Sequence, residues 1–304
     1  MAAEISIRPA KSRQELESVL DVAFRVSGGP LPAVDELEHA LVNDVGCTYL
    51  LGYWDGEPAA SGVGKVSSLV GCLFAMVRVL PEFRGRRVGR ALYGALSDHA
   101  RSVGRNKLFG RIREDDTSSL QAVVAHGFAE IGREFPVVLD LRTASQASTA
   151  PPAGIEITNL ADRPDLARAA WDVEVEAAPD IPTEGGVEAW PFERWRSGVL
   201  DAPSALPEAA VVAVANGEVV GSAVLAALSD GGAEHGLTAV RRAWRGRGIA
   251  TALKSAQIEW ARRTGYTELH TSNDETNLSM RSINTRLGYE AAPAFAMVRG
   301  PLAR

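Results

Sequence analysis

The chain has 304 residues, 46% of them hydrophobic and 23% charged, a composition typical of a globular protein with a sizeable core. At roughly 150 residues per domain, this length favours two domains. The net charge of −6 argues against a nucleic-acid-binding protein. Only two cysteines and no run of about 18 apolar residues occur. We therefore expect a cytoplasmic protein without disulfides, metal site or membrane-spanning segment.

The first elements follow in a regular order. Alternating apolar residues at Ile5–Ile7 predict a short strand, and the pattern around Arg13–Phe24 predicts a helix. Two further alternating segments, Thr48–Tyr53 and Ala59–Gly64, flank the pair Asp55-Gly56. This pair is favoured in tight hairpin turns, because such turns need positive φ at both central positions. The segments therefore predict a β-hairpin.

A break in this pattern occurs at 143–153, where the residues are small, polar and proline-bearing. Such a composition suits an interdomain linker, so we divide the chain into domains 1–142 and 154–304. The second half opens like the first, with a predicted strand at Ile155–Ile157 and a helical pattern around Asp165–Val175.

The two halves are related by a single shift of 161 positions, which places Asp55 on Asn216. The shift aligns two hairpin turns, two Gly/Arg-rich turns, two Ala-Leu pairs and two Gly-aromatic pairs. These landmarks are Asp55-Gly56 with Asn216-Gly217, Phe83–Arg86 with Trp244–Arg247, Ala91-Leu92 with Ala252-Leu253, and Gly127-Phe128 with Gly288-Tyr289. The second hairpin runs from Ala210–Ala215 to Val219–Leu225. The sequence therefore predicts a duplicated mixed α/β domain, each copy a central, mostly antiparallel sheet flanked by helices.

The Gly/Arg-rich turn of the second copy follows a predicted strand at Leu237–Val240 and reads Arg-Arg-Ala-Trp-Arg-Gly-Arg-Gly-Ile-Ala over 241–250. Apolar residues then recur on one helical face, at Ile249, Leu253, Ala256 and Trp260. Glycines before a helix allow a ligand to approach the backbone, and the first N–H groups of the helix attract anions. The turn therefore suits a pyrophosphate, with Arg245 and Arg247 as added donors.

Two other phosphate motifs compete with this interpretation. A dinucleotide-binding turn needs G-x-G-x-x-G with an acidic residue about 20 positions on, and a P-loop ends in Gly-Lys-Ser/Thr. Neither pattern is present in the turn. The remaining alternative is a solvated, arginine-rich helix start.

A second motif decides between these alternatives. Thr271-Ser-Asn273 is followed by Asn277-x-x-Met280-x-x-x-Asn284-x-x-Leu-Gly-Tyr289. With Val240 and Arg245-x-x-Gly248-x-Ala250, the segment 238–290 resembles the GNAT N-acetyltransferase superfamily, and the chain resembles its tandem members. The resemblance implies acetyl-CoA as cofactor. The implied contact residues are Thr238, Ala239, Val240, Arg245, Gly246, Arg247, Gly248, Ile249, Ala250, Thr251, Asn277, Met280 and Asn284.

The first copy departs from the motif. It carries Arg87 in place of Gly248, and Asp116, Ser119 and Val123 replace Asn277, Met280 and Asn284. An Asp would add negative charge near a phosphorylated ligand, so we expect this copy to be degenerate. Whether it binds cofactor stays open; its candidate contacts are Val77, Val79, Arg84, Gly85, Arg86, Arg87 and Gly89.

The resemblance implies direct attack of an acceptor amine on the thioester in a ternary complex, with backbone N–H groups of Thr238–Val240 facing the pantetheine and the carbonyl. Many members have a Tyr general acid where this chain has Asn284, whose amide can only donate a hydrogen bond. Glu234 and His235, expected just before the strand, are the candidate bases. The alternative is that both residues lie on a Gly-rich loop and have no catalytic role.

Two further residues complete the site prediction. Asn273, at a strand end, is a candidate for positioning the acceptor or a water. Tyr289 lies too late in the chain to replace the missing Tyr acid and is predicted to be core.

Acidic residues crowd the segment before the second hairpin, at Asp172, Glu174, Glu176, Asp180, Glu184 and Glu188. This field favours a small cationic amine as acceptor; the alternative is a solvated helix face. The rival functions are an acyl-CoA-binding regulatory protein without turnover and a protein N-acetyltransferase. Acceptor identity, acyl-chain length and the choice between monomer and homodimer stay open.

Overall fold

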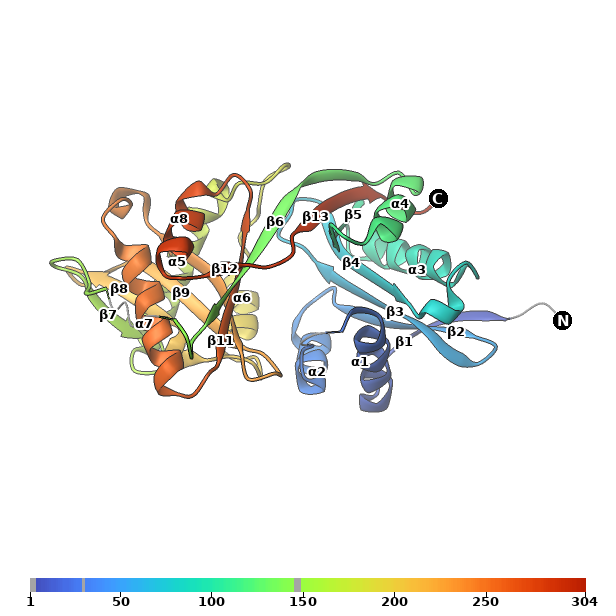
Figure 1. Cartoon of the computed structure of the whole chain (residues 1–304), viewed down its shortest axis with the longest axis horizontal. Coiled ribbons are helices and arrows are strands. Elements are labelled where there is room, and N and C mark those ends of the chain that lie inside the picture. Colours follow the sequence, from blue (N-terminus) through green and yellow to red (C-terminus); the bar gives the residue numbers. More distant parts are fainter. Residues whose placement is uncertain (1–3, 29–30, 145–148) are drawn as a thin grey trace. The chain divides into compact units, whose positions relative to one another are not determined.

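The computed structural model describes residues 4–28, 31–144 and 149–304. The chain forms two compact units (Figure 1). Unit 1 contains the residues up to Gly132 together with Phe295–Arg304, and unit 2 contains Arg133–Ala294. Within the described ranges, no helix combines the length and apolar character needed to cross a bilayer.

The sheet of unit 1 has the strand order β1-β2-β3-β4-β5-β13, and its pairings are antiparallel except for β4 with β5. Its strands are β1 (Ile5–Pro9), β2 (Thr48–Trp54), β3 (Glu57–Val66), β4 (Cys72–Val79), β5 (Lys107–Arg113) and β13 (Phe295–Pro301). Its helices are α1 (Arg13–Ser27), α2 (Val34–Asn43), α3 (Val88–Ser102) and α4 (Thr117–Ala125), with the single 3-10 turn η1 (Pro81–Phe83).

Helices cover both faces of this sheet, because successive residues of a strand point to opposite sides. Tyr49 and Leu51 of β2 pack against Leu16 of α1. Leu50, between them, packs against Leu92 of α3 on the other face. The burial of both faces explains the near-continuous apolar run of β2.

The sheet of unit 2 repeats this plan in the order β7-β8-β9-β10-β11-β6, with β10 and β11 the parallel pair. Its strands are β7 (Glu156–Asn159), β8 (Val211–Ala215), β9 (Glu218–Ala227), β10 (Ala233–Val240), β11 (Glu268–Asp274) and β6 (Ala129–Asp140), with the short β12 (Glu290–Ala291) paired to β6. Its α-helices are α5 (Ala167–Ala177), α6 (Phe192–Val199), α7 (Ile249–Arg263) and α8 (Leu278–Arg286). Its 3-10 turns are η2 (Pro164–Leu166), η3 (Ala178–Asp180), η4 (Pro207–Ala209) and η5 (Arg242–Trp244).

The two faces of this sheet also receive different helices. Val212 of β8 packs with Val173 of α5 and Trp195 of α6. Its neighbour Val211 packs with Leu253 of α7. The helix that follows the Gly/Arg-rich turn therefore lies on the face opposite to α5 and α6.

The hairpin turns confirm the predicted repeat at the level of the backbone. Asp55 and Gly56 have φ of 49° and 85°, and Asn216 and Gly217 have φ of 50° and 81°. Positive φ at both central residues is the geometry that Asp-Gly and Asn-Gly pairs adopt at little cost. The shift of 161 therefore superimposes real structural equivalents.

The last strand of each sheet comes from the other half of the chain. Most of β6 belongs to unit 2, and β13 belongs to unit 1. This grouping differs from the predicted division into 1–142 and 154–304, because backbone pairing, and not chain connectivity, decides which sheet a strand joins. Part of the predicted linker 143–153 lies outside the described residues.

Candidate functional site

The parallel strands β10 and β11 separate soon after they begin. They pair only at Ala233 with Leu269 and at Glu234 with His270. Beyond this point β10 keeps only β9 as a neighbour. The backbone from His235 onward therefore has no partner strand on the β11 side.

A bulge accompanies this separation. The pairing of β10 with β9 steps from His235 opposite Leu225 to Thr238 opposite Ala223, so β10 carries one extra residue here. A Cβ at Gly236 would lie 2.6 Å from Val224 Cγ2, which explains the glycine in the bulge. The bulge turns backbone groups of β10 out of the regular ladder, as an oxyanion-binding strand requires.

One sequence expectation is wrong at this strand. Glu234 and His235 were expected just before the strand, with a place in the Gly-rich loop as the alternative, but β10 begins at Ala233 and includes both. The Gly-rich composition concealed the start of the strand, because Gly231 and Gly232 lie in the turn before β10 whereas Gly236 lies in its bulge. Thr238, Ala239 and Val240 form the end of β10, as expected.

The Gly/Arg-rich turn leads directly into α7, which begins at Ile249 as predicted. Gly246 and Gly248 have φ of 74° and 82°, and no side chain caps the helix. An added Cβ at Gly246 would meet nothing within 4 Å. The first-turn N–H groups, around Ala250 and Thr251, have no partner inside the helix. They form the anion-attracting end that the sequence predicted.

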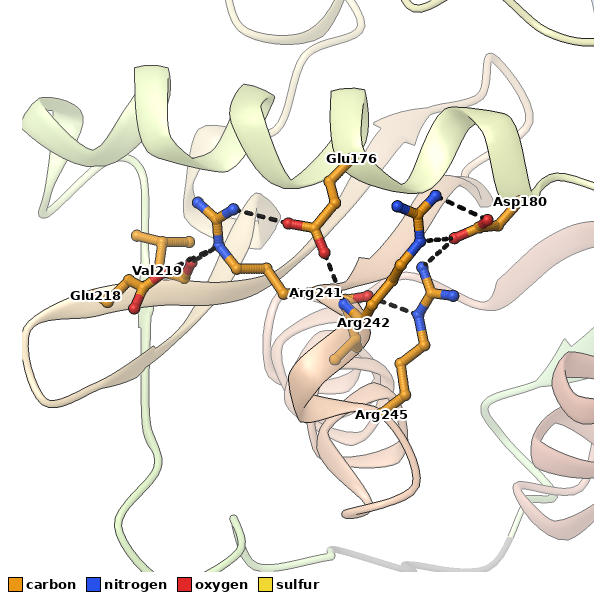
Figure 2. Close-up of polar contacts among 8 residues, drawn as sticks. Glu176, Asp180, Glu218, Val219, Arg241, Arg242 and Arg245 are labelled. Atoms are coloured by element: carbon orange, nitrogen blue, oxygen red, sulfur yellow. Dashed lines mark hydrogen bonds and ion pairs between the residues drawn. The ribbon is translucent and has the colours of Figure 1, made fainter.

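The arginines of this turn serve partly as braces (Figure 2). Arg245 Nε donates to Val240 O at 2.9 Å, and its NH2 lies 2.8 Å from Asp180 Oδ2. Arg242 binds the same carboxylate with two hydrogen bonds of 2.9 Å. Hydrogen bonds from Arg242 and then Arg245 lower the pKa of Asp180 to about 2. The described contacts of Arg245 thus hold the turn, and its predicted role in phosphate binding stays a prediction.

Helix α5 holds the end of β10 through Glu176. Its Oε1 accepts a hydrogen bond from Arg242 N at 2.7 Å, and its Oε2 accepts one from Arg241 NH1 at 2.9 Å (Figure 2). Arg241 Nε also donates to Val219 O at 2.8 Å. Two residues of the acidic run, Glu176 and Asp180, therefore neutralise arginines of the turn and are not a free acidic surface.

Arg247 is the second predicted guanidinium ligand, and like Arg245 it is exposed. Its NH2 donates to Ala243 O at 3.0 Å, and its guanidinium lies 4.7 Å from the centre of the Trp244 ring. Both contacts are local to the turn. Arg247 is therefore held beside the helix start.

His235 belongs to a buried polar network. Its Nδ1 lies 3.0 Å from Gln257 Oε1 and its Nε2 lies 2.5 Å from Tyr289 Oη. Gln257 Nε2 in turn donates to Ala209 O at 2.9 Å. Burial, and then the charge of Lys254, place the pKa of His235 well below its usual value. A neutral imidazole with both nitrogens occupied is a poor proton acceptor, so these contacts leave Glu234 as the better proposed base.

Unit 2 buries three further polar side chains, and two of them have amide atoms without partners in the described residues. Asn284, 1% exposed, has neither amide atom hydrogen-bonded, and Asn273 Nδ2 has no partner. Lys254 is also 1% exposed, and its Nζ lies 5.4 Å from the centre of the Tyr289 ring. Desolvation lowers the pKa of Lys254 to about 7. Buried polar groups of native proteins nearly always have partners, so the two amides point to a ligand.

Leu253-Lys254 contributed to the resemblance to tandem GNAT proteins, but the sequence analysis assigned no role in the site to Lys254 or Gln257. A polar residue within a helix is normally assigned to the solvent face, but both positions lie beside the apolar Leu253 and Ile258 and are buried. Their spacing of three places them on one side of α7. Two polar residues on the buried side of an amphipathic helix were the available signal.

The predicted ligand Asn277 has a structural role in the described chain. Its Oδ1 accepts a hydrogen bond from Met280 N at 3.2 Å and caps α8. In unit 1, Asp116 Oδ1 accepts one from Ser119 N at 3.0 Å and caps α4 in the same way. The Asp in the first copy therefore preserves the cap, and its charge is not by itself a sign of damage.

The equivalent turn of unit 1 is built differently. Strands β4 and β5 pair through Phe74 and Phe109, and β4 runs along β3 without a bulge. Arg87 takes the left-handed conformation of Gly248, with φ of 68°. Arg84 Nε donates to Val79 O at 3.3 Å, which repeats the bond of Arg245. The bracing arginine is thus shared by both units, whereas the bulge is not.

The remaining candidate contacts of the first copy surround this turn. Val77 lies on β4 and is exposed, and Gly85 has φ of 74°. Arg86 stacks over Trp54 at 5.1 Å from the ring centre, and Gly89 lies in the first turn of α3. They form a helix start like that of α7.

The features described above occur together in one known protein family. The model of the acetyltransferase (GNAT) family matches residues 14–128 and again residues 171–289. The chain belongs to the GNAT family. It contains the GNAT domain twice, as its sequence predicted, and the acyl-CoA-dependent chemistry of that family suits the loop and strands described above.

Solved structures show the same tandem fold. A GCN5-related N-acetyltransferase from Sphaerobacter thermophilus has 22% identity and a TM-score of 0.76, with 99% of this chain and 96% of that chain covered. A tandem GNAT protein from the clavulanic acid biosynthesis pathway has 20% identity and a TM-score of 0.76, with 99% of each chain covered. No curated protein sequence matches the chain.

Proposed function

We propose that this tandem GNAT protein transfers the acetyl group of acetyl-CoA to the primary amine of a small, cationic acceptor, and that unit 2 carries the reaction. The open first turn of α7, next to strands β10 and β11 where they separate, carries the proposal. Unit 2 also buries Asn284, whose two amide atoms have no partner in the described residues, and Asn273, whose Nδ2 has none. A ligand with a diphosphate and a long polar arm fits both features.

The diphosphate would bind the backbone N–H groups of Gly246–Thr251, because a helix start without a cap attracts anions. The pantetheine arm and thioester carbonyl would lie along Thr238–Val240. A backbone donor aimed at the developing oxyanion is worth a few kcal/mol. Asn284, in place of the usual Tyr, would donate a hydrogen bond to the pantetheine or to sulfur.

The acceptor amine must lose a proton before it attacks. Glu234 is the first proposed base, since it lies on β10 at the last position paired with β11. Glu174 on α5 is a second candidate, because burial raises its pKa to about 7 and its Oε1 has no hydrogen-bond partner in the described residues. A carboxylate in an apolar place attracts a cation, which supports a cationic acceptor.

The test is release of the CoA thiol from acetyl-CoA by the full chain with a panel of polyamines, aminoglycosides and neutral amino acids. We expect turnover with the cationic amines. A preference for neutral amino acids would refute the cationic acceptor. Binding of acetyl-CoA without turnover on any amine would support the rival function, a regulatory acyl-CoA-binding protein.

A further inference from the structure

Lys254 is a charged residue in an unusual place. It projects from α7 and is 1% exposed, and desolvation by burial, with no carboxylate among the described residues to oppose it, lowers its pKa. The titratable groups that face it are His235 on β10 and Tyr289 after α8, and neither supplies a negative charge. Buried lysines are rarely retained without a carboxylate or another partner, so structural stability does not account for this one.

Asn284 lies in the same neighbourhood. Its backbone carbonyl accepts the hydrogen bond of Tyr289 N at 3.1 Å, while Lys254 Nζ faces the Tyr289 ring. Neither amide atom of the Asn284 side chain has a partner in the described residues. Helices α7 and α8 thus each bring one buried polar side chain to the surroundings of Tyr289.

These groups lie where β10 leaves β11. Tyr289 Oη is hydrogen-bonded to His235, the residue that follows the last β10–β11 pair at Glu234. The bulge at Gly236 starts directly after it. Under the proposed function, this is the part of the strand that the thioester must reach.

We propose that Lys254 Nζ contacts the sulfur of the bound thioester and is the acid that protonates the departing thiolate, with Asn284 as its hydrogen-bonding neighbour. This inference rests on the proposed function. Many family members use a Tyr acid at the position of Asn284. In this chain Lys254, on a different helix, would replace that acid.

The proposed step transfers the acetyl group from sulfur to the amine nitrogen. The amine nitrogen forms a bond to the carbonyl carbon, the C–S bond breaks, and its electron pair stays on sulfur. Lys254 transfers one proton from Nζ to that sulfur, and the nitrogen of the new amide gives one proton to the base or to water. Lys254 then regains a proton from water. A group that is half protonated at neutral pH can donate and recover its proton with little driving force in either direction.

The equivalent position in unit 1 offers a natural control. A shift of 161 places Lys254 on Tyr93, whose Oη donates to Pro301 O at 2.8 Å. Tyr93 therefore has a partner within the protein and leaves nothing for a ligand. Replacing it should not affect chemistry in unit 2.

The experiment uses the full chain and coenzyme A itself, so that no acceptor is needed. The ionisation of the bound thiol is followed by the ultraviolet absorbance of the thiolate in wild type, Lys254→Met and Tyr93→Phe. An ammonium group at the sulfur stabilises the thiolate, so the pKa of the bound thiol should be lower by about 1 in wild type and Tyr93→Phe than in Lys254→Met. Lys254→Met replaces the lysine by an apolar side chain of similar length, and its folding is checked by thermal unfolding.

The outcomes separate the two proposals. If coenzyme A binds and its thiol ionises equally in all three proteins, the role of Lys254 is refuted while the proposed function stands. If coenzyme A does not bind wild type at millimolar concentration, both are refuted. Acetylation of Lys254 itself on incubation with acetyl-CoA, seen by mass spectrometry, would make it a nucleophile and also refute the acid role.

A rate profile gives a second readout. For an active amine, Lys254→Met should lower kcat by about tenfold or more and remove the fall in kcat above neutral pH, with KM for acetyl-CoA little changed. A merely structural lysine would leave the shape of the pH profile unchanged.

Discussion

The two units share a fold and differ in what they bury. When the two halves are aligned with a shift of 161, six polar residues of unit 2 are equivalent to apolar or internally bonded residues of unit 1. The set His235, Lys254, Gln257, Asn273, Asn284 and Tyr289 corresponds to Phe74, Tyr93, Leu96, Ile112, Val123 and Phe128. Since the fold forms without these polar groups in unit 1, it does not need them. Two of them in unit 2, Asn273 and Asn284, have amide atoms without partners in the described residues, which supports the proposal that a ligand accounts for them.

The backbone differs at the same place. In unit 2, β10 carries a bulge at Gly236 as it leaves β11, whereas β4 of unit 1 stays in register with β3. An added Cβ at Gly110 of β5 would lie 2.9 Å from Ala75 O, so the two strands of unit 1 remain close just beyond their last pair. Since β4 continues to Val79 after its last pair with β5 at Phe74, the two units share the separation of the parallel strands and differ in the bulge.

The largest expected effect comes from a matched pair of glycine substitutions. Gly246 and Gly85 both have φ of 74° and nothing within 4 Å of an added Cβ, so Asp strains both turns equally. Gly246→Asp places a carboxylate at the proposed diphosphate and should weaken acetyl-CoA binding more than about hundredfold, while Gly85→Asp should leave it near wild type. Calorimetry on the full chain measures both. Equal losses would show that the units do not differ as cofactor sites.

These binding studies need the whole chain. Because β6 and β13 are exchanged between the halves, each half alone lacks the last strand of its sheet. An isolated half would expose an unpaired strand edge, which favours aggregation. Point substitutions are therefore the better comparison.

The burial of Lys254 should affect the free energy of unfolding of the chain. Its pKa of about 7 in the folded chain lies below the ordinary 10.5, so between about pH 7 and pH 10.5 the unfolded chain binds more protons and stability rises with pH. Lys254→Met should therefore raise the free energy of unfolding, by about 2 kcal/mol at pH 6 and progressively less toward pH 10. Denaturant titrations at several pH values measure this.

The matched substitution in unit 1, Tyr93→Phe, should change the free energy of unfolding in the opposite direction. Tyr93→Phe removes a hydrogen bond to Pro301 O and should lower stability by up to about 1 kcal/mol with no such pH dependence. If Lys254→Met were also destabilising at pH 6, Lys254 would have a structural partner and the contrast between the units would weaken.

Local pattern predicted much of this fold. The hairpin turns at Asp55-Gly56 and Asn216-Gly217 and the start of α7 at Ile249 depend on φ preferences and on residues close in sequence, and the structure has them there. The exchange of β6 and β13 depends on pairing between distant segments, which no local pattern records. The early start of β10 at Ala233 was missed because its bulge uses a glycine.

The site was predicted less completely than the fold. The turn built on Gly246 and Gly248 and the helix start after it lie where they were predicted, and the binding of an anion there stays a prediction. The brace formed by Asp180 on Arg242 and Arg245 joins residues 62 or more positions apart and could not be seen in the sequence. The polar network was missed because Lys254, taken alone, favours a solvated place on a helix.

The brace supports a smaller prediction. Asp180→Asn keeps the shape but removes the charge that Arg242 and Arg245 share, so the turn should loosen and the affinity for acetyl-CoA should fall by about threefold to tenfold. Titration of acetyl-CoA at constant ionic strength measures it. A rise in affinity would instead show that Asp180 holds Arg245 away from the phosphates, and would make Arg245 a direct ligand.

The smallest effect should come from the caps, where the two units agree. Asn277 and Asp116 each accept a hydrogen bond from the third residue on, at Met280 and Ser119. If this is the whole role of Asn277, Asn277→Asp should change the free energy of unfolding by less than about 0.5 kcal/mol and leave the affinity for acetyl-CoA unchanged. Asn277→Ala should lower the free energy of unfolding by about 1 kcal/mol, and Asp116→Ala should do the same in unit 1. A loss of affinity in Asn277→Asp without a loss of stability would return Asn277 to the cofactor site. The charge of Asp116 would then count against binding in unit 1.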